Sequence, residues 1–173
     1  MSLAIAIADA VTVLGNGALS WGISKFTGPV SHIGLVTAIE PVVQVTQALR
    51  DGIKTLTLAE TMANVRYGYV LHDTTFEDAA RAKMVAWGLK QIGTPYAFGN
   101  LALEALDALL NTEKFSIYFD EDGADICSQY FSLAAASIGR SCDITPRKAT
   151  PSDWFNFSLR SPSWLTQPIP VTA

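Results

Sequence analysis

The spacing of apolar residues changes halfway along the chain, and this change constrains the fold more than any other feature. In the first half, apolar residues alternate with polar or small residues in short runs, which is typical of β-strands with one buried face. Five such runs are present, at residues 10–14, 32–39, 42–49, 55–58 and 66–72. Asp51-Gly52 lies between two of them, and this pair favours a hairpin because it accepts positive φ angles. The first half therefore predicts antiparallel strands.

The second half has the spacing of amphipathic helices. The clearest one is predicted after Thr75, a candidate N-cap, and runs up to Gly93. Further helices are expected from Asn100 and near Cys127. Another is expected after Thr150, which is followed by a first-turn proline and an acidic third position. Strands followed by helices predict an α+β fold, with an antiparallel sheet or small barrel packed against helices.

The composition is that of a single folded domain over residues 1–173. Of these residues 49% are hydrophobic and 16% are charged, which suits a substantial core. The net charge is −4, and no run of Lys or Arg is present that could follow phosphates, so a nucleic-acid partner is not expected. The uncharged stretches are too short for a membrane span.

The N-terminus does not have the pattern of a secretory signal peptide. No basic residue precedes the first apolar residues, and Asp9 soon interrupts them. We therefore expect the protein either to act in the cytoplasm or to be carried elsewhere, for example in a virus particle.

Two cysteines and two histidines are the residues that could bind a metal or form a disulfide. Cys127 and Cys142 could pair, but two cysteines are far from a disulfide framework. No local pair of ligands has the spacing that zinc sites usually show, so neither a metal nor a cofactor is expected. His72 ends a predicted strand, and we expect it to be an ordinary surface residue.

Cys127 is the first candidate for a chemical role. It lies in the first turn of a predicted helix that Asp125 can cap. Unpaired backbone N–H groups at this end favour a thiolate, the form that a nucleophile requires, whereas nearby acidic residues oppose it. The alternative is a small apolar side chain that fills a gap in the core, as most free cysteines do.

His32 opens a predicted strand, so its ring can project from the rim of the sheet into a cleft. Gln44 lies on the next strand, where its amide oxygen could accept the Nδ1–H of the imidazole and orient the ring. Glu40 is the rival for this role, but it lies beside Pro41 and is expected to face solvent. The alternative for both His32 and Gln44 is an outward-facing strand residue without a role.

Four segments together resemble the circularly permuted papain-like amidases, a branch of the NlpC-type peptidases that includes lecithin:retinol acyltransferase-like proteins. The segments are residues 9–14 with the turn after them, 30–36 around His32, 42–46 around Gln44, and 125–131 around Cys127, which residues 94–98 precede. Residues 150–153 match a common later segment. Histidine precedes cysteine, the order typical of permuted members. The likeness covers residues from about 9 to about 155.

The resemblance implies roles for individual residues. Cys127 would be the nucleophile, His32 the general base and Gln44 the residue that orients the imidazole. Many relatives have Glu where Gln44 stands, and a Gln there stabilises the imidazolium less. Tyr96 is a candidate oxyanion donor beside the backbone N–H of Cys127.

Three functions follow as hypotheses. The first is a cysteine amidase or peptidase that forms an acyl-enzyme, with peptidoglycan stem peptides as the substrate class that the family implies. The second uses the same three residues on a lipid ester or amide, by hydrolysis or acyl transfer. The third is a catalytically silent binding or structural module, for example of a virion, because a fold does not determine a function.

Overall fold

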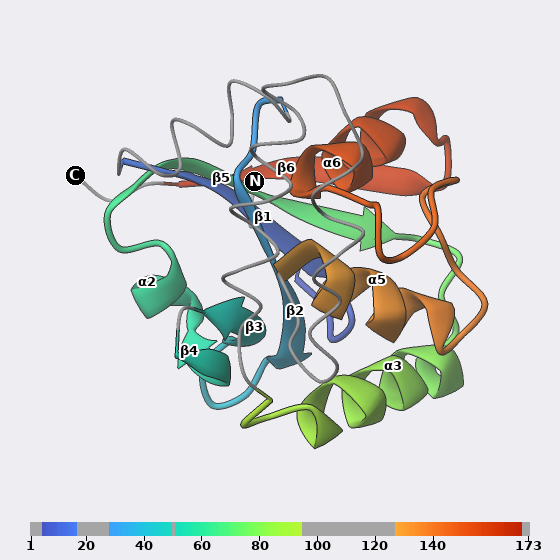
Figure 1. Ribbon diagram of the computed structural model, residues 1–173, viewed down its shortest axis with the longest axis horizontal. Coiled ribbons are helices and arrows are strands. Elements are labelled where there is room, and N and C mark those ends of the chain that lie inside the picture. Colours follow the sequence, from blue (N-terminus) through green and yellow to red (C-terminus); the bar gives the residue numbers. More distant parts are fainter. Residues whose placement is uncertain (1–4, 17–27, 50, 95–126, 171–173) are drawn as a thin grey trace, which may run out of the picture.

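The computed structural model describes residues 5–16, 28–49, 51–94 and 127–170, and within them six strands form one antiparallel sheet (Figure 1). The strand order is β4-β3-β2-β1-β5-β6. The strands are β1 (Ala10–Gly15), β2 (His32–Ala38), β3 (Gln44–Leu49), β4 (Gly52–Thr57), β5 (Val65–Asp73) and β6 (Trp164–Ile169). Each of the five predicted strand runs overlaps one of the first five strands. The C-terminal strand β6 was not predicted.

The hairpin predicted from Asp51-Gly52 is present between β3 and β4. Leu49 pairs with Gly52, and the φ angle of Gly52 is 108°, a conformation that L side chains rarely adopt. Local turn chemistry therefore sets the register of this hairpin. The connection between β2 and β3 is less regular, because the pairing shifts between Val36 and Ala38.

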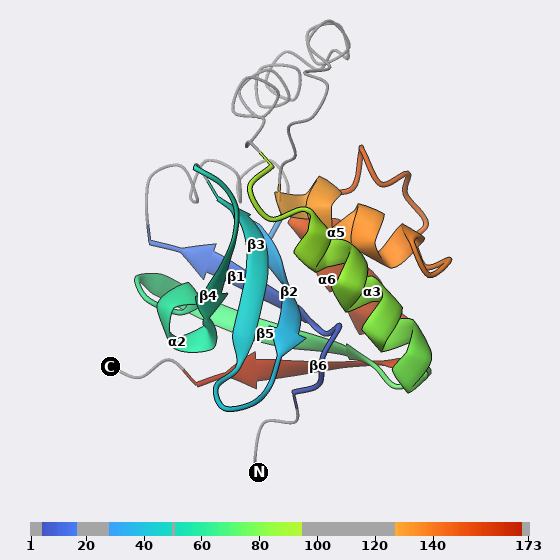
Figure 2. The ribbon, with the colours of Figure 1, turned by 90° about the horizontal axis from the view of Figure 1, so that it is seen from below.

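Three helices cover one face of the sheet: α3 (Asp78–Lys90), α5 (Cys127–Ala136) and α6 (Pro151–Arg160). Figure 2 shows them together on one side of the strands. Their apolar side chains join those of the sheet in the larger core cluster, and Trp154, Tyr130 and Phe131 are its largest fully buried members. The α+β class predicted from the sequence is thus confirmed.

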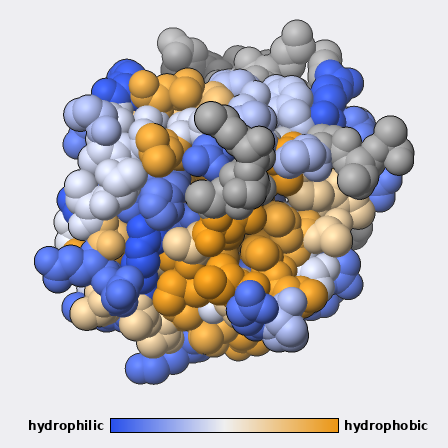
Figure 3. All heavy atoms as spheres, turned by 180° about the vertical axis from the view of Figure 1, so that it is seen from behind, coloured by the Kyte–Doolittle hydropathy of each residue, from blue (hydrophilic) through white to orange (hydrophobic). Residues whose placement is uncertain are grey.

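The opposite face of the sheet holds a second, smaller apolar cluster made mainly of valines, among them Val11, Val36 and Val45. The short helix α2 (Leu58–Thr61) lies on this side, and Leu58 packs against the cluster. No other described helix contributes to it. Figure 3 shows that apolar residues also gather on the outer surface of the molecule, on the face turned away from the viewer in Figure 1.

Two of the predicted helix starts, at Thr150 and at Thr75, had different outcomes. Thr150 caps α6 with a full capping box, in which its hydroxyl accepts from the backbone of Asp153 and the carboxylate of Asp153 accepts in return. Thr75 does not cap α3, whose N-cap is Glu77. The backbone N–H and hydroxyl of Thr75 instead donate to the carboxylate of Asp73, which holds Thr75 in a turn before the helix.

The helix predicted from Asn100 lies outside the described residues. Among the described residues, no helix is long and apolar enough to cross a membrane.

Candidate active site

His32 is the first residue of β2, so it lies at the rim of the sheet as predicted from the sequence. It pairs across the sheet with Val13 of β1, and its side chain is partly buried. Strand pairing on a central strand fixes the backbone here, and the ring therefore projects from a rigid support.

Cys127 is the first described residue of α5, and its thiol meets the His32 ring. The two side chains are joined by a hydrogen bond and by the attraction between their charged forms. Cys127 is 7% exposed, and α5 packs against β2. The structure therefore brings together the two residues that the sequence singled out, although they lie 95 positions apart in the chain.

The surroundings of Cys127 favour its thiolate. Burial acts to raise the pKa of the thiol. The charge and the hydrogen bond of the His32 ring, together with hydrogen bonds from the backbone N–H groups of Ile33 and Ser128, outweigh burial, so the pKa is lowered from the ordinary value. These groups surround the sulfur with donors, which is the environment of a reactive cysteine.

His32 is shifted in the complementary direction. Burial acts to lower the pKa of the imidazole, but the Cys127 thiolate and hydrogen bonds to Cys127 and Gln47 raise it above the ordinary value. A lowered thiol pKa beside a raised imidazole pKa describes a thiolate–imidazolium pair. Because the two groups interact this strongly, they titrate as a pair, and the interaction shifts their equilibrium toward the thiolate–imidazolium form.

The residue behind the imidazole is Gln47, whereas Gln44 was predicted for this role from the sequence. Gln47 Oε1 lies 2.6 Å from His32 Nε2. Gln44 is the first residue of β3 and pairs with Ala38, which lies at the opposite end of β2 from His32. The prediction of Gln44 was therefore wrong, and so was the prediction that Nδ1 is the bonded nitrogen. Nε2 carries this bond, which leaves Nδ1 for the thiol.

The register of β2 against β3 explains why Gln47 reaches His32. Leu35 pairs with Thr46, so the next position toward the start of β2 brings Gly34 beside Gln47. His32 and Gly34 lie on the same face of β2 because side chains alternate along a strand. A Cβ at Gly34 would lie 3.1 Å from Gln47 Cβ and 2.6 Å from Val45 Cγ1. The absence of a side chain at Gly34 thus gives Gln47 room to cross to the histidine.

Gln47 is almost fully buried at 1% exposed, and both ends of its amide are hydrogen-bonded. Its Nε2 donates to Thr61 Oγ1 at 2.8 Å, and Thr61 Oγ1 donates to the backbone carbonyl of Thr57 at 3.0 Å. A buried amide with both ends satisfied is held in one orientation. The series Thr57, Thr61, Gln47, His32 and Cys127 is therefore one connected chain of polar contacts.

The other cysteine differs sharply from Cys127. Burial raises the pKa of the Cys142 thiol to about 11, and both cysteines are free. An ordinary buried thiol of this kind is unreactive near neutral pH. The two cysteines therefore provide an internal comparison within one molecule.

The remaining candidates from the sequence lie elsewhere. Glu40 is exposed, as expected. Tyr96, the candidate oxyanion donor, and Asp125, the candidate cap of α5, lie outside the described residues.

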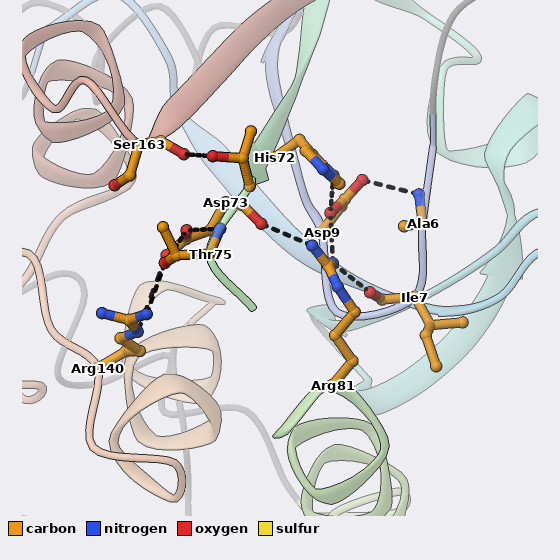
Figure 4. A network of polar contacts seen from close by, with 10 residues as sticks. Ala6, Ile7, Asp9, His72, Asp73, Thr75, Arg81, Arg140 and Ser163 are labelled. Carbon is orange, nitrogen blue, oxygen red and sulfur yellow. Dashed lines mark hydrogen bonds and ion pairs between the residues drawn. The ribbon is translucent and has the colours of Figure 1, made fainter. Parts of the chain in front are cut away.

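His72 was expected to be an ordinary surface residue, but it belongs to a buried ionic network (Figure 4). Its Nδ1 lies 2.8 Å from Oδ1 of Asp9, which also accepts from Arg81 at 3.0 Å. Arg81 further donates to the backbone carbonyls of Ile7 and Asp73. Burial raises the pKa of Asp9. The network joins the segment before β1 to β5 and α3, so its role is structural.

Among the described residues, no group of three or more His, Cys, Asp or Glu side chains lies close enough to hold a metal ion. Within those residues, the connected thiol, imidazole and amide of Cys127, His32 and Gln47 form the arrangement best suited to carry out a chemical reaction.

The comparisons with known proteins show a fold but not a family. No protein-family model matches the chain, and no curated protein matches it. Among solved structures, the chain is similar to the metalloprotein yiiX from Escherichia coli O157:H7, a DUF1105 protein. The similarity has a TM-score of 0.68 and covers 96% of this chain and 97% of that one, with 14% sequence identity. At this identity the similarity shows the fold alone.

Proposed function

We propose that the protein is a cysteine hydrolase of the circularly permuted papain-like kind that cleaves an amide bond. The observation that carries the proposal is the thiol of Cys127 against the His32 ring, with the Gln47 amide on the other ring nitrogen. A nucleophile, a base and a residue that orients the base are the three parts that such a reaction needs.

The proposed reaction uses each of these groups in turn. The Cys127 thiolate attacks the carbonyl carbon of the substrate, and a C–S bond forms. The His32 imidazolium donates its proton to the leaving nitrogen as the C–N bond breaks, which leaves an acyl-enzyme and a free amine. His32, now neutral, takes a proton from water, and the resulting hydroxide attacks the acyl group. The C–S bond breaks, and the carboxylic acid leaves.

Gln47 has a defined part in this reaction. Its oxygen accepts the Nε2–H and keeps Nδ1 directed at the sulfur in both charge states of the ring. A neutral amide stabilises the imidazolium less than a carboxylate does. The pKa of Cys127 is nevertheless lowered without a carboxylate at this position, because the charge and hydrogen bond of His32 act together with two backbone N–H groups that also stabilise the thiolate.

The permuted papain-like assignment rests on the order of the parts. The histidine strand β2 precedes the cysteine helix α5 in the chain, and the amide comes from the strand next to the histidine strand. For this class of fold, the resemblance noted in the sequence implies peptidoglycan stem peptides as the substrate. We therefore propose a cell-wall peptide as the first substrate to test.

The test is release of free amines from soluble cell-wall fragments, with phospholipid vesicles assayed in parallel for fatty acid. We expect amine release by the wild type, no release by Cys127→Ala, and full release by the matched control Cys142→Ala. Fatty acid release that depends on Cys127 would move the substrate class to lipids. Absence of turnover on any amide or ester, or turnover that survives Cys127→Ala, would contradict a hydrolase and favour a silent module.

A further inference from the structure

The orientation of the Gln47 amide decides which nitrogen of the neutral His32 ring carries the proton, and this orientation is fixed from outside the Cys127–His32–Gln47 group. An amide presents an oxygen at one end and an NH₂ group at the other, and both shapes fit the same space. If the Gln47 amide were reversed, its NH₂ group would face His32 Nε2. The proton of a neutral ring would then sit on Nδ1, where it would block the nitrogen that must accept the thiol proton.

The backbone carbonyl of Thr57 can only accept a hydrogen bond, and this fixes the donor and the acceptor in each of the following hydrogen bonds. The backbone oxygen of Thr57 lies 3.0 Å from Thr61 Oγ1, so the Thr61 hydroxyl must donate its hydrogen to that oxygen. Thr61 Oγ1 can then only accept from Gln47, 2.8 Å away, so the Gln47 atom that faces it is Nε2. The Gln47 oxygen is thereby turned to His32 Nε2, which must carry a proton.

We propose that Thr61 is a positioning residue that sets the tautomer of His32 through Gln47 and keeps Nδ1 free to act as the base. This inference rests on the proposed function, because a defined tautomer matters only if His32 accepts a proton from Cys127. Thr61 touches neither the substrate nor the thiol in this account, and it acts only through the amide.

The support for Thr61 is itself built into the fold. Thr61 is 9% exposed and ends the single turn of α2, and Thr57 caps the start of the same turn. A capping box between Thr57 and Glu60 holds this turn in place, with Thr57 Oγ1 accepting from the Glu60 backbone at 3.1 Å and Glu60 accepting from the Thr57 backbone at 2.7 Å. The hydroxyl of Thr61 is thus anchored on β4 and α2, independently of β2 and α5.

The test compares Thr61→Val, which keeps the shape and removes the hydroxyl, with Thr61→Ser, which keeps the hydroxyl. The matched control is Thr46→Val, because Thr46 is also a buried threonine with two hydroxyl hydrogen bonds, to Thr37 at 2.9 Å and to Thr55 at 2.8 Å. Thermal unfolding of each variant checks the fold. The rate of Cys127 alkylation by iodoacetamide is then measured from about pH 4 to about pH 9, a range that spans the ordinary His and Cys pKa values.

Thr61→Val is expected to lower alkylation of Cys127 near pH 6 by about tenfold, since a tautomer change weakens a hydrogen bond to a charged group. Thr61→Ser should restore the wild-type profile, and Thr46→Val should leave it unchanged. In a Gln47→Leu background, Thr61→Val should have no further effect. Equal profiles for wild type and Thr61→Val, or an equal loss in Thr46→Val, would overturn the proposal.

A second measurement needs only the wild-type protein and so does not depend on how Thr61→Val folds. The ¹⁵N chemical shifts of the ring nitrogens are recorded at a pH where His32 is neutral, and its signals are assigned by their loss in His32→Gln. We expect a protonated Nε2 and an unprotonated Nδ1. A protonated Nδ1 would overturn the assignment of the amide.

Failure of the inference differs from failure of the proposed function. If wild-type Cys127 is no more reactive than Cys142, the proposed function fails. The ¹⁵N shifts of the His32 ring still test whether Thr61 sets the tautomer in that case. If Cys127 is reactive at low pH and the tautomer is Nδ1–H, the function stands and the inference fails.

Discussion

Removal of the Gln47 side chain tests how far the reactivity of Cys127 depends on the residue behind the imidazole. The variant Gln47→Ala deletes the acceptor that lies 2.6 Å from His32 Nε2. The Gln47 bond is one of the causes that raise the pKa of His32, so its loss makes the ring hold its proton less tightly. The thiolate–imidazolium pair is then less stable relative to the neutral thiol–imidazole pair.

The size of the effect follows from the kind of bond that is lost. A hydrogen bond to a charged group is worth about 1.5 to 3 kcal/mol, which equals about one to two pKa units. The equilibrium should therefore move toward the neutral pair by about 10- to 100-fold. Cys127 should lose most of its reactivity below neutral pH and regain it only as the pH approaches about 8.5, the range of an ordinary thiol.

The assay is alkylation by iodoacetamide as a function of pH, with the modified peptides quantified by mass spectrometry. Cys142, whose pKa is raised to about 11, serves as the slow internal reference. Gln44→Ala is the matched control, because it removes the same side chain from the same strand at a position paired with Ala38. Equal pH profiles for Gln47→Ala and Gln44→Ala would refute the reasoning.

Three further changes have defined outcomes. Gly34→Ala places a Cβ 2.6 Å from Val45 Cγ1 and 3.1 Å from Gln47 Cβ. We expect urea unfolding to show about 1 to 3 kcal/mol of destabilisation, and Cys127 to be less reactive at low pH. An unchanged stability would contradict the close approach. Asp9→Ala leaves the buried Arg81 without its carboxylate, so chemical denaturation should show a free energy of unfolding lower by about 3 to 5 kcal/mol. A decrease below about 1 kcal/mol would mean that water replaces the Asp9 carboxylate. Thr150→Ala removes the capping box of α6, and its midpoint in urea should fall by the equivalent of about 0.5 to 2 kcal/mol, with Thr145→Ala as the control outside the helix.

Local chemistry explains which parts of the fold could be predicted from the sequence. The turn at Gly52 and the capping box at Thr150 depend on residues within three or four positions of one another, and both were predicted correctly. Thr75 had the same local signal, but Asp73 competes for its N–H and hydroxyl. The strand β6 escaped prediction because Pro168 interrupts its pattern; β6 lies at the edge of the described sheet, where a proline is tolerated.

The candidate site shows where this kind of prediction stops. Cys127 and His32 were identified because the sequence predicts Cys127 in the first turn of a helix and His32 at the start of a strand, and because their order along the chain resembles that of permuted papain-like proteins. The choice between Gln44 and Gln47 depends on the register of β2 against β3, and the pairing shift between Val36 and Ala38 is not visible in the pattern. Gly34, beside Gln47, was the one available signal, because a glycine within a strand marks a close approach of another group.

His72 was misjudged for a related reason. Its partner Asp9 is distant in the chain, and the two come together only through the pairing of β1 with β5. No local pattern reports such a contact, so ionic networks between strands remain hidden until the sheet order is known.

The most direct test of the account is the ratio of the alkylation rates of Cys127 and Cys142 in the folded wild-type protein at about pH 6, below the ordinary pKa of both thiols. The opposite pKa directions of the two thiols predict that Cys127 reacts much faster, and that His32→Ala removes most of the difference. Equally slow labelling of both cysteines, or a fast Cys127 that is unaffected by His32→Ala, would contradict the claim that the two residues form a thiolate–imidazolium pair.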